Sequence, residues 1–244
     1  KETIEALCDR RFGIGADGLI AVEPSRGKGG TVRMRYYNAD GGEAEMCGNG
    51  ARCFGNFAAA LLHHDKSAPL PFETMAGIVT ATFEKDGNVT VNLTDPHSLQ
   101  LFVLNADPTV GADVHFLNTG VPHAVAFLDK LDGLDVPRLG AYLRYHSAFS
   151  PKGTNANFAR ILSPGHIAIR TYERGVEDET LACGTGMTAS ALLHAVLTDA
   201  PSPIQVDVAG GDTLKVGFQR TGDRFTTVTL TGPADLVFTG DIEL

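Results

Sequence analysis

Short segments in which apolar and polar residues alternate make up most of the chain and predict β-strands. Turns rich in glycine, asparagine and aspartate, such as residues 86–88, separate these segments. The segments with this pattern are residues 32–37, 79–83, 89–93, 166–170, 214–218 and 226–230. We therefore expect a protein built mainly of β-sheet.

Two longer segments have a helical pattern instead. In the first, apolar residues recur at positions 54, 57, 58, 61 and 62, the spacing of one helix face. The second, residues 187–197, is apolar or small on nearly all sides, which is typical of a helix buried inside its domain. The sequence therefore predicts two helices against a background of strands.

Each predicted helix follows the same cysteine motif, CGNG at residues 47–50 and CGTG at residues 183–186. Internal duplication is the economical explanation of such a repeat. We predict an α+β (α/β) fold of two pseudo-symmetric strand-rich halves, each wrapped around a central helix, with the active site in the cleft between them. The predicted halves are residues 1–110 and 111–230, and residues 231–244 return to the N-terminal half.

Composition excludes several classes of protein. The chain has 244 residues, 43% of them hydrophobic, so it can bury a large core. With 20 basic and 29 acidic side chains its formal net charge is −9, which argues against nucleic-acid binding. No apolar run approaches the ~20 residues that span a bilayer, and the first residues do not have a signal-peptide pattern. We expect a cytoplasmic protein without a membrane partner.

The four cysteines fit neither a disulfide framework nor a zinc site, because no CxxC pair occurs among them. Cys8 and Cys53 are expected to be small hydrophobic residues. Cys47 and Cys183 differ, since the partial positive charge at a helix start favours a thiolate there. The glycine amides beside them suit a carboxylate. A buried thiol and a Cys47–Cys183 disulfide are the alternatives for this pair.

Two thiols on opposite sides of a substrate suit removal of a proton from a carbon next to a carboxylate and its replacement on the other face. One cysteine must start as thiolate and the other as thiol, and their titrations are then coupled. Fixed amide dipoles in a water-excluded cleft stabilise the carbanion. This scheme needs no pyridoxal lysine, so we expect no cofactor and no metal. The GxGxxG pattern at residues 13–18 is no dinucleotide fingerprint, because a strand rather than a helix is expected after it.

Further motifs accompany the two cysteines. They are RRFGIGADG at 10–18, YNADG at 37–41, GVPH at 120–123, GTNANF at 153–158 and YERG at 172–175. With these motifs the chain resembles the diaminopimelate epimerase family over nearly its whole length. The resemblance implies an isomerase that interconverts LL- and meso-diaminopimelate in lysine and peptidoglycan-precursor synthesis, with a two-domain fold and a small amino-acid substrate. A homodimer is left open.

The resemblance also implies the residues of the site. They are catalytic Cys47, Cys183, His123 and Glu173, and substrate-binding Asn38, Gly48, Asn49, Asn155, Arg174, Gly184 and Thr185. By this resemblance, His123 and Glu173 would relay protons to the thiols or orient the amino group of the substrate. The four amides at the helix starts would bind the reacting carboxylate. Arg174 and the asparagines at 38 and 155 would hold the distal end of the substrate. Each has a structural alternative: a turn cap for the histidine, an exposed ion pair for the glutamate and arginine, and turns for the asparagines.

The chain departs from the family at the edges of this site. Many members have asparagine where this chain has Val121, and glutamine where it has Gly18, and both side chains contact substrate. The chain begins at Lys1, and we expect a preceding segment that carries a further asparagine in the family. The loop from Glu173 to Cys183 is a residue longer than in some members. An enzyme of the same fold acting on another amino acid, a non-catalytic carboxylate-binding protein and a thiol–disulfide redox protein are the rival hypotheses.

Overall fold

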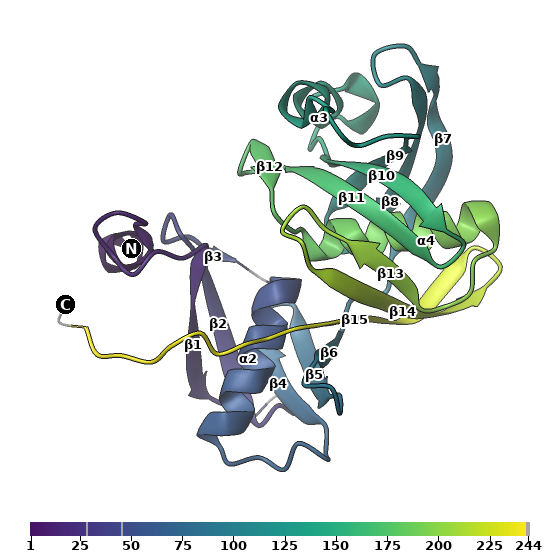
Figure 1. The fold of residues 1–244 in the computed structure, drawn as a ribbon. Helices are drawn as coiled ribbons and strands as arrows, with labels where there is room; N and C mark the ends of the chain where they lie inside the picture. Colours follow the sequence, from purple (N-terminus) through teal and green to yellow (C-terminus); the bar gives the residue numbers. More distant parts are fainter. Residues whose placement is uncertain (28, 45, 243–244) are drawn as a thin grey trace. The chain divides into compact units, whose positions relative to one another are not determined.

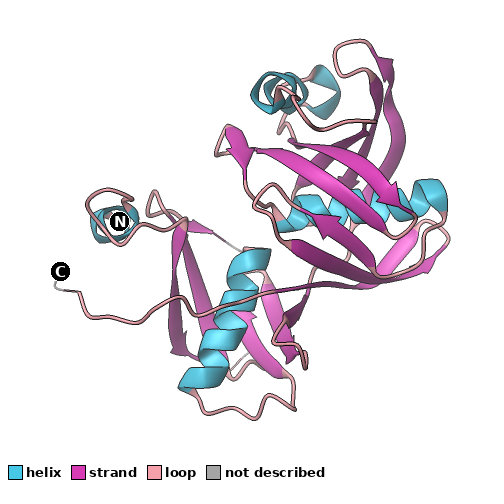
Figure 2. Cartoon of the chain, viewed as in Figure 1, coloured by secondary structure: helices cyan, strands magenta, loops and turns pink. Residues whose placement is uncertain are grey.

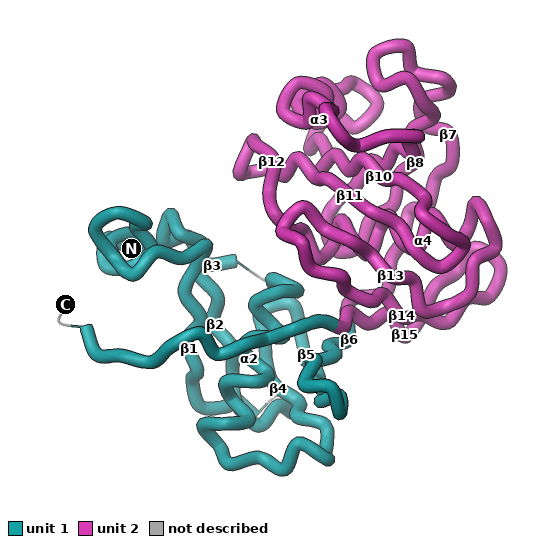
Figure 3. Tube along the Cα trace, in the orientation of Figure 1, with its two compact units in different colours: residues 1–92, 232–244 teal, residues 93–231 magenta. Residues whose placement is uncertain are grey.

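The computed structural model describes residues 1–27, 29–44 and 46–242. The chain divides into two compact units, residues 1–92 with 232–244, and residues 93–231 (Figure 3). The boundaries predicted from the sequence, after residues 110 and 230, stay predictions about where two folding domains separate. None of the described helices is long and apolar enough to cross a membrane.

The first unit is a mostly antiparallel sheet with a helix packed on it (Figures 1 and 2). Its strands lie in the order β1-β2-β4-β5-β6, and β3 pairs with β2. Among the described strands of this unit, only β2 and β4 run parallel to each other. The elements are α1 (Glu2–Cys8), β1 (Gly18–Pro24), β2 (Val32–Asn38), β3 (Glu43–Ala44), α2 (Gly48–Leu61), β4 (Leu70–Thr74), β5 (Gly77–Phe83) and β6 (Val89–Asn92). The C-terminal segment adjoins α2, where Asn56 Nδ2 donates to the carbonyl of Ala234 at 2.6 Å.

The face of α2 that contacts the sheet matches the predicted apolar positions only in part. Phe54 and Ala58 are fully buried, but Phe57 and Leu61 are 50% and 55% exposed. Gly55 is buried instead, and a Cβ atom on it would lie 2.6 Å from the Cβ of Ala81 on β5. The small residues of the helix therefore face the sheet and let the two backbones approach closely, which turns two large apolar side chains outward.

The second unit is a larger sheet that covers α4. Its strands lie in the order β15-β14-β13-β11-β10-β9-β8-β7, with β12 beside β11. The elements are β7 (His97–Asp107), β8 (Ala112–Asn118), β9 (Pro122–Phe127), α3 (Val136–Arg144), a 3₁₀ turn (Ser147–Phe149), β10 (Asn155–Ser163), β11 (His166–Glu173), β12 (Asp178–Thr180), α4 (Gly184–Thr198), β13 (Ile204–Asp207), β14 (Thr213–Thr221) and β15 (Arg224–Gly232). Met187, Leu192 and Leu193 of α4 are fully buried. The prediction of a buried second helix is confirmed.

The two units repeat one topology. In each, two antiparallel strands are followed by a short strand, a helix and a strand parallel to the second strand. The series β1-β2-β3-α2-β4-β5-β6 thus corresponds to β10-β11-β12-α4-β13-β14-β15. The predicted fold of two pseudo-symmetric strand-rich halves around a helix is confirmed. The segment β7-β8-β9-α3, which the pattern did not predict, precedes the repeat in the second unit and places β9 parallel to β10.

Candidate active site

The two cysteine motifs form the same local structure. Cys47 is the N-cap of α2, with φ −138° and ψ 120°, and Cys183 is the N-cap of α4, with φ −121° and ψ 108°. In both helices the cysteine carbonyl accepts the first helical hydrogen bond at 2.8 Å, from Ala51 and Met187 respectively. Each thiol therefore stands at the partly positive end of a helix, as the sequence predicted.

The sulfur atoms make short-range polar contacts within their own motif. The amide of Gly50 donates to Sγ of Cys47 at 3.4 Å, and Oγ1 of Thr185 lies 3.5 Å from Sγ of Cys183. Cys183 is 6% exposed, whereas Cys47 is half-buried. None of the four cysteines, all in the described part of the chain, is in a disulfide.

The first amides of each helix have no acceptor within the helix, so those of Gly48, Asn49, Gly184 and Thr185 suit an anionic group. In α4 the motif's last glycine is also a packing requirement. A Cβ atom on Gly186 would lie 2.3 Å from Oδ1 of Asn157 on β10. This close approach brings the helix start against the polar side chains of the β9–β11 region.

His123 is fully buried on β9. Nδ2 of Asn157 donates to its Nδ1 at 3.1 Å and to the carbonyl of Ala124 at 3.0 Å, which places the imidazole proton on Nε2. Among the described residues Nε2 has no hydrogen-bond partner. Burial, assisted by the charge of Arg174, lowers the pKa of His123 to about 3. The ring is therefore neutral at physiological pH and offers one N–H donor.

Three other candidates lie at the ends of β10 and β11. Oδ1 of Asn155 accepts from the amide of Arg174 at 2.8 Å, and its Nδ2 donates to the carbonyl of Pro122 at 3.1 Å. Glu173 accepts a hydrogen bond from Oγ1 of Thr180 at 3.0 Å. Asn155 thus holds in place the turn that carries Arg174.

Contacts connect these residues to the start of α4 within the second unit. Oγ1 of Thr119, in the turn before β9, donates to the carbonyl of Thr185 at 3.0 Å, and Oγ1 of Thr171 donates to Asn157 at 3.0 Å. His123, reached through Asn157, belongs to the same cluster. Asn157, Thr119 and Thr171 also belong to this cluster, although the sequence motifs did not indicate them. Polar residues at alternate positions of a buried strand, Asn155 and Asn157, were the available signal.

The candidates of the first unit are fewer. Asn38 ends β2 and is exposed, and its backbone closes the turn to β3 through a 2.8 Å bond to the carbonyl of Gly42. Oδ1 of Asn49 accepts from Nη1 of the buried Arg52 at 3.1 Å. Cys47, Gly48 and Asn49 form the start of α2 itself.

Comparison with known proteins shows the family to which the chain belongs. The sequence profile described as diaminopimelate epimerase matches residues 1–99 and 115–237. The chain belongs to the diaminopimelate epimerase family. It is 43% identical over 245 residues to the diaminopimelate epimerase of Chlorobaculum tepidum, covering 100% of this chain and 91% of that one, and 43% identical to that of Flavobacterium psychrophilum, covering 96% and 87%. The resemblance and the isomerase class predicted from the sequence are confirmed.

The fold is shared more widely. The crystal structure of a hydroxyproline epimerase from Agrobacterium vitis, with bound trans-4-hydroxy-L-proline, superposes with a TM-score of 0.64 at 19% identity, covering 95% of this chain and 76% of that one. At that identity the likeness concerns the fold alone.

Two of the expected departures from the family, at Gly18 and Val121, lie in differently packed places. Gly18 begins β1, and a Cβ atom on it would lie 2.4 Å from the carbonyl oxygen of Tyr37 and 2.9 Å from the ring of Tyr36. A glutamine there would require this backbone to move. Val121 is half-buried in the β8–β9 turn, where its carbonyl accepts from the amide of Thr119 at 3.1 Å.

Proposed function

We propose that this protein interconverts LL- and meso-diaminopimelate, in lysine and peptidoglycan-precursor synthesis, with Cys47 and Cys183 as its acid–base pair. The observation that carries the proposal is the same cysteine-capped helix start, built twice, in a chain of this family. One thiolate removes the α-proton from one face of the carbon, and the other thiol delivers a proton to the opposite face. The reverse reaction exchanges the two roles.

The helix starts supply electrostatic stabilisation as well as thiols. The amides of Gly48, Asn49, Gly184 and Thr185 stabilise the negative charge that spreads from the α-carbon into its carboxylate. Amide donors fixed by a helix need no reorganisation during the reaction, and one such donor is typically worth about 10²–10³ in kcat. No bound cofactor enters this scheme.

His123 acts in this proposal as a neutral hydrogen-bond donor rather than as a proton carrier. The low pKa of His123 disfavours the imidazolium form. Because Nδ1 already accepts a hydrogen bond from Asn157, the Nε2–H group is the donor that can bind the substrate. Glu173 is then the nearby group that can accept from the substrate amino group. The donor and the acceptor together orient the amino group of the substrate.

Arg174, Asn155 and Asn38 hold the distal end of the substrate. The guanidinium of Arg174 is suited to grip a carboxylate with two parallel hydrogen bonds. Asn155 supports that grip by holding the backbone of Arg174, and it keeps one N–H of its amide for the substrate.

Proton NMR in D₂O with LL-diaminopimelate tests the proposal. We expect loss of the α-proton signal together with formation of the meso isomer. Binding of LL-diaminopimelate, seen as thermal stabilisation, without solvent exchange at the α-carbon would contradict the proposal and support a carboxylate-binding protein.

A second candidate function is racemisation or epimerisation of another amino acid by the same two thiols. Gly18 and Val121 favour it, because they remove two polar contacts that many family members make with diaminopimelate. Histidine, proline and glutamate assayed beside LL-diaminopimelate would separate the two functions through their kcat/KM values. A homodimer, a cytoplasmic location and the absence of nucleic-acid binding stay predictions.

A further inference from the structure

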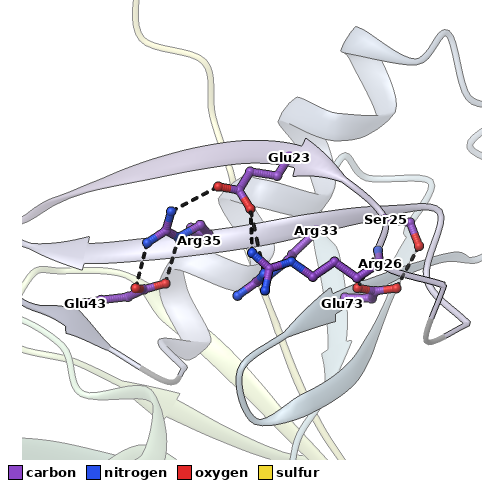
Figure 4. A network of polar contacts seen from close by, with 7 residues as sticks. All are labelled: Glu23, Ser25, Arg26, Arg33, Arg35, Glu43 and Glu73. Atoms are coloured by element: carbon purple, nitrogen blue, oxygen red, sulfur yellow. Dashed lines mark hydrogen bonds and ion pairs between the residues drawn. The ribbon is translucent and has the colours of Figure 1, made fainter.

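An arginine and a glutamate join the two strands that precede the first cysteine (Figure 4). Nε and Nη2 of Arg35, on β2, each donate to one oxygen of Glu43, on β3, both at 2.8 Å. The third nitrogen, Nη1, donates to Glu23 on β1 at 3.0 Å. All three guanidinium nitrogens of Arg35 therefore donate hydrogen bonds, and the parallel pair to Glu43 closes the β2–β3 hairpin.

The second unit contains the same arrangement ahead of the second cysteine. Nε and Nη2 of Arg170, on β11, donate to the two oxygens of Glu179, on β12, at 2.7 and 2.6 Å. Its Nη1 donates to the carbonyls of Leu131 and Leu134 at 2.9 and 3.0 Å. All four charged side chains are only 23–30% exposed. We call the two pairs, Arg35–Glu43 and Arg170–Glu179, the hairpin clamps.

The hairpin clamps occupy equivalent positions. Each glutamate stands four residues before the cysteine that caps the helix, and each arginine three residues before a candidate site residue, Asn38 or Glu173. The register matches as well, since Glu43 lies opposite Tyr37 and Glu179 opposite Tyr172, two residues after the arginine in both cases. An isolated surface ion pair has no reason to recur at one place in both halves.

The hairpin clamps hold the two short strands that precede the cysteines. β3 has two residues and β12 has three, so few backbone hydrogen bonds attach either strand to its neighbour. β3 ends three residues before Cys47, and β12 ends three residues before Cys183. A bidentate pair fixes both the position and the direction of the strand, which a single ion pair does not do.

We propose that the two hairpin clamps are positioning devices, each of which sets the place of one acid–base cysteine relative to its own sheet. The proposal rests on the proposed two-thiol function and names four residues, Arg35, Glu43, Arg170 and Glu179, that do not touch the reacting atoms. Hydrogen bonding to Arg35 lowers the pKa of Glu43, so its carboxylate is ionised at neutral pH and the clamp persists.

The test removes one clamp at a time. Glu43→Gln and Glu179→Gln each keep the shape of the side chain but lose one of the two acceptor oxygens. Since displacement of a reacting group by about 1 Å can cost about 10²-fold, we expect kcat with LL-diaminopimelate to fall at least about tenfold while KM changes little. Glu43→Asp, which keeps the charge on a shorter side chain, is a second variant if Glu43→Gln does not fold, and we expect the same loss of kcat from it.

A second readout does not depend on the epimerase activity. The ratio of iodoacetamide alkylation rates at pH 7 and pH 9.5 reports how much thiolate each cysteine holds at pH 7. We expect Glu43→Gln to lower this ratio about two- to fivefold at Cys47 but not at Cys183, and Glu179→Gln to do the reverse. Trypsin cleaves after Arg52, so Cys47 and Cys53 are counted in separate peptides by mass spectrometry.

Glu23→Gln is the matched control, because it removes the other carboxylate of Arg35 without opening the hairpin. We expect wild-type kcat and alkylation ratios from it. An equal loss from Glu23→Gln, or clamp variants with lower Tm but unchanged kcat and ratios, would overturn the proposal. A wild-type protein without activity on diaminopimelate would overturn the proposed function, while the cysteine-specific change in alkylation would still support the clamps.

Discussion

The last glycine of the cysteine motif is packed differently in the two helices, and alanine substitution tests the consequence. In α4, a Cβ atom on Gly186 would lie 2.3 Å from Oδ1 of Asn157. In α2, a Cβ atom on Gly50 would lie no closer than 3.4 Å to its neighbours, Cβ of Cys47 and Cε of Met34. We therefore expect Gly186→Ala to be damaging and Gly50→Ala to be tolerated.

The magnitude for Gly186→Ala comes from the contacts of Asn157. A carbon and an oxygen pack at about 3.3 Å, so the two groups must separate by about 1 Å. Asn157 cannot move freely, because His123, Ala124 and Thr171 all share hydrogen bonds with it. Overpacking with loss of one such bond costs about 2–4 kcal/mol of unfolding free energy, or roughly 5–10 °C in Tm. A shift of the α4 start by this distance lowers kcat about 10²-fold.

Differential scanning calorimetry and the epimerase assay on both alanine variants make the comparison. Gly50→Ala should keep kcat near the wild-type value, and its Tm should stay equal or rise, because alanine stabilises a helix by about 0.5–1 kcal/mol relative to glycine. The double variant Gly186→Ala/Asn157→Ala should lose less unfolding free energy than the two single variants lose together. Equal losses in Gly186→Ala and Gly50→Ala would refute the packing argument.

Further outcomes follow from other parts of the structure. Cys47→Ala and Cys183→Ala should each lower kcat by about 10²–10⁴-fold in the epimerase assay, and wild-type activity in either would contradict the two-base assignment. Burial lowers the pKa of His123 to about 3, whereas the histidine of the unfolded chain is protonated below about pH 6.5. Because only the unfolded state takes up this proton, the unfolding free energy measured by urea denaturation should fall by about 2 kcal/mol from pH 7 to pH 5. This contribution should be absent in His123→Gln. Gly18→Ala should lower the unfolding free energy by about 1–3 kcal/mol in the same urea denaturation experiment, because its Cβ atom would clash with the carbonyl oxygen of Tyr37. An unchanged urea midpoint would show that β1 can shift to relieve the clash.

Some of the site could be predicted because it depends on local structure. The repeated cysteine–glycine motif before an apolar run predicts a thiol at a helix start, and both Cys47 and Cys183 are N-caps in the structure. The role of Asn157 could not be predicted in this way. Its partners His123 and Thr171 lie 34 and 14 residues away, and no local pattern specifies which side chain a buried amide will meet.

The same division holds for the fold. Alternation along the strands and the repeated motif were sufficient for two strand-rich halves around a helix, because the periods of strands and helices are fixed by backbone geometry. The buried face of α2 was not predictable from apolarity, since Phe57 and Leu61 give a stronger signal than Gly55. The close approach of Gly55 to Ala81 decides that face, and a close approach of two backbones exists only in the assembled sheet.

The sequence by itself determined the duplicated halves, the two helix starts with their thiols, and membership of a family that inverts an amino-acid carbon. Tertiary structure decided the polar contacts beyond the helix starts: a buried neutral His123 held by Asn157, and a bidentate arginine–glutamate pair in the hairpin ahead of each cysteine. The physical reason is the range of the interactions. Caps and strand periods arise within about four residues of chain, whereas hydrogen bonds between neighbouring strands join residues that only the folded sheet brings together.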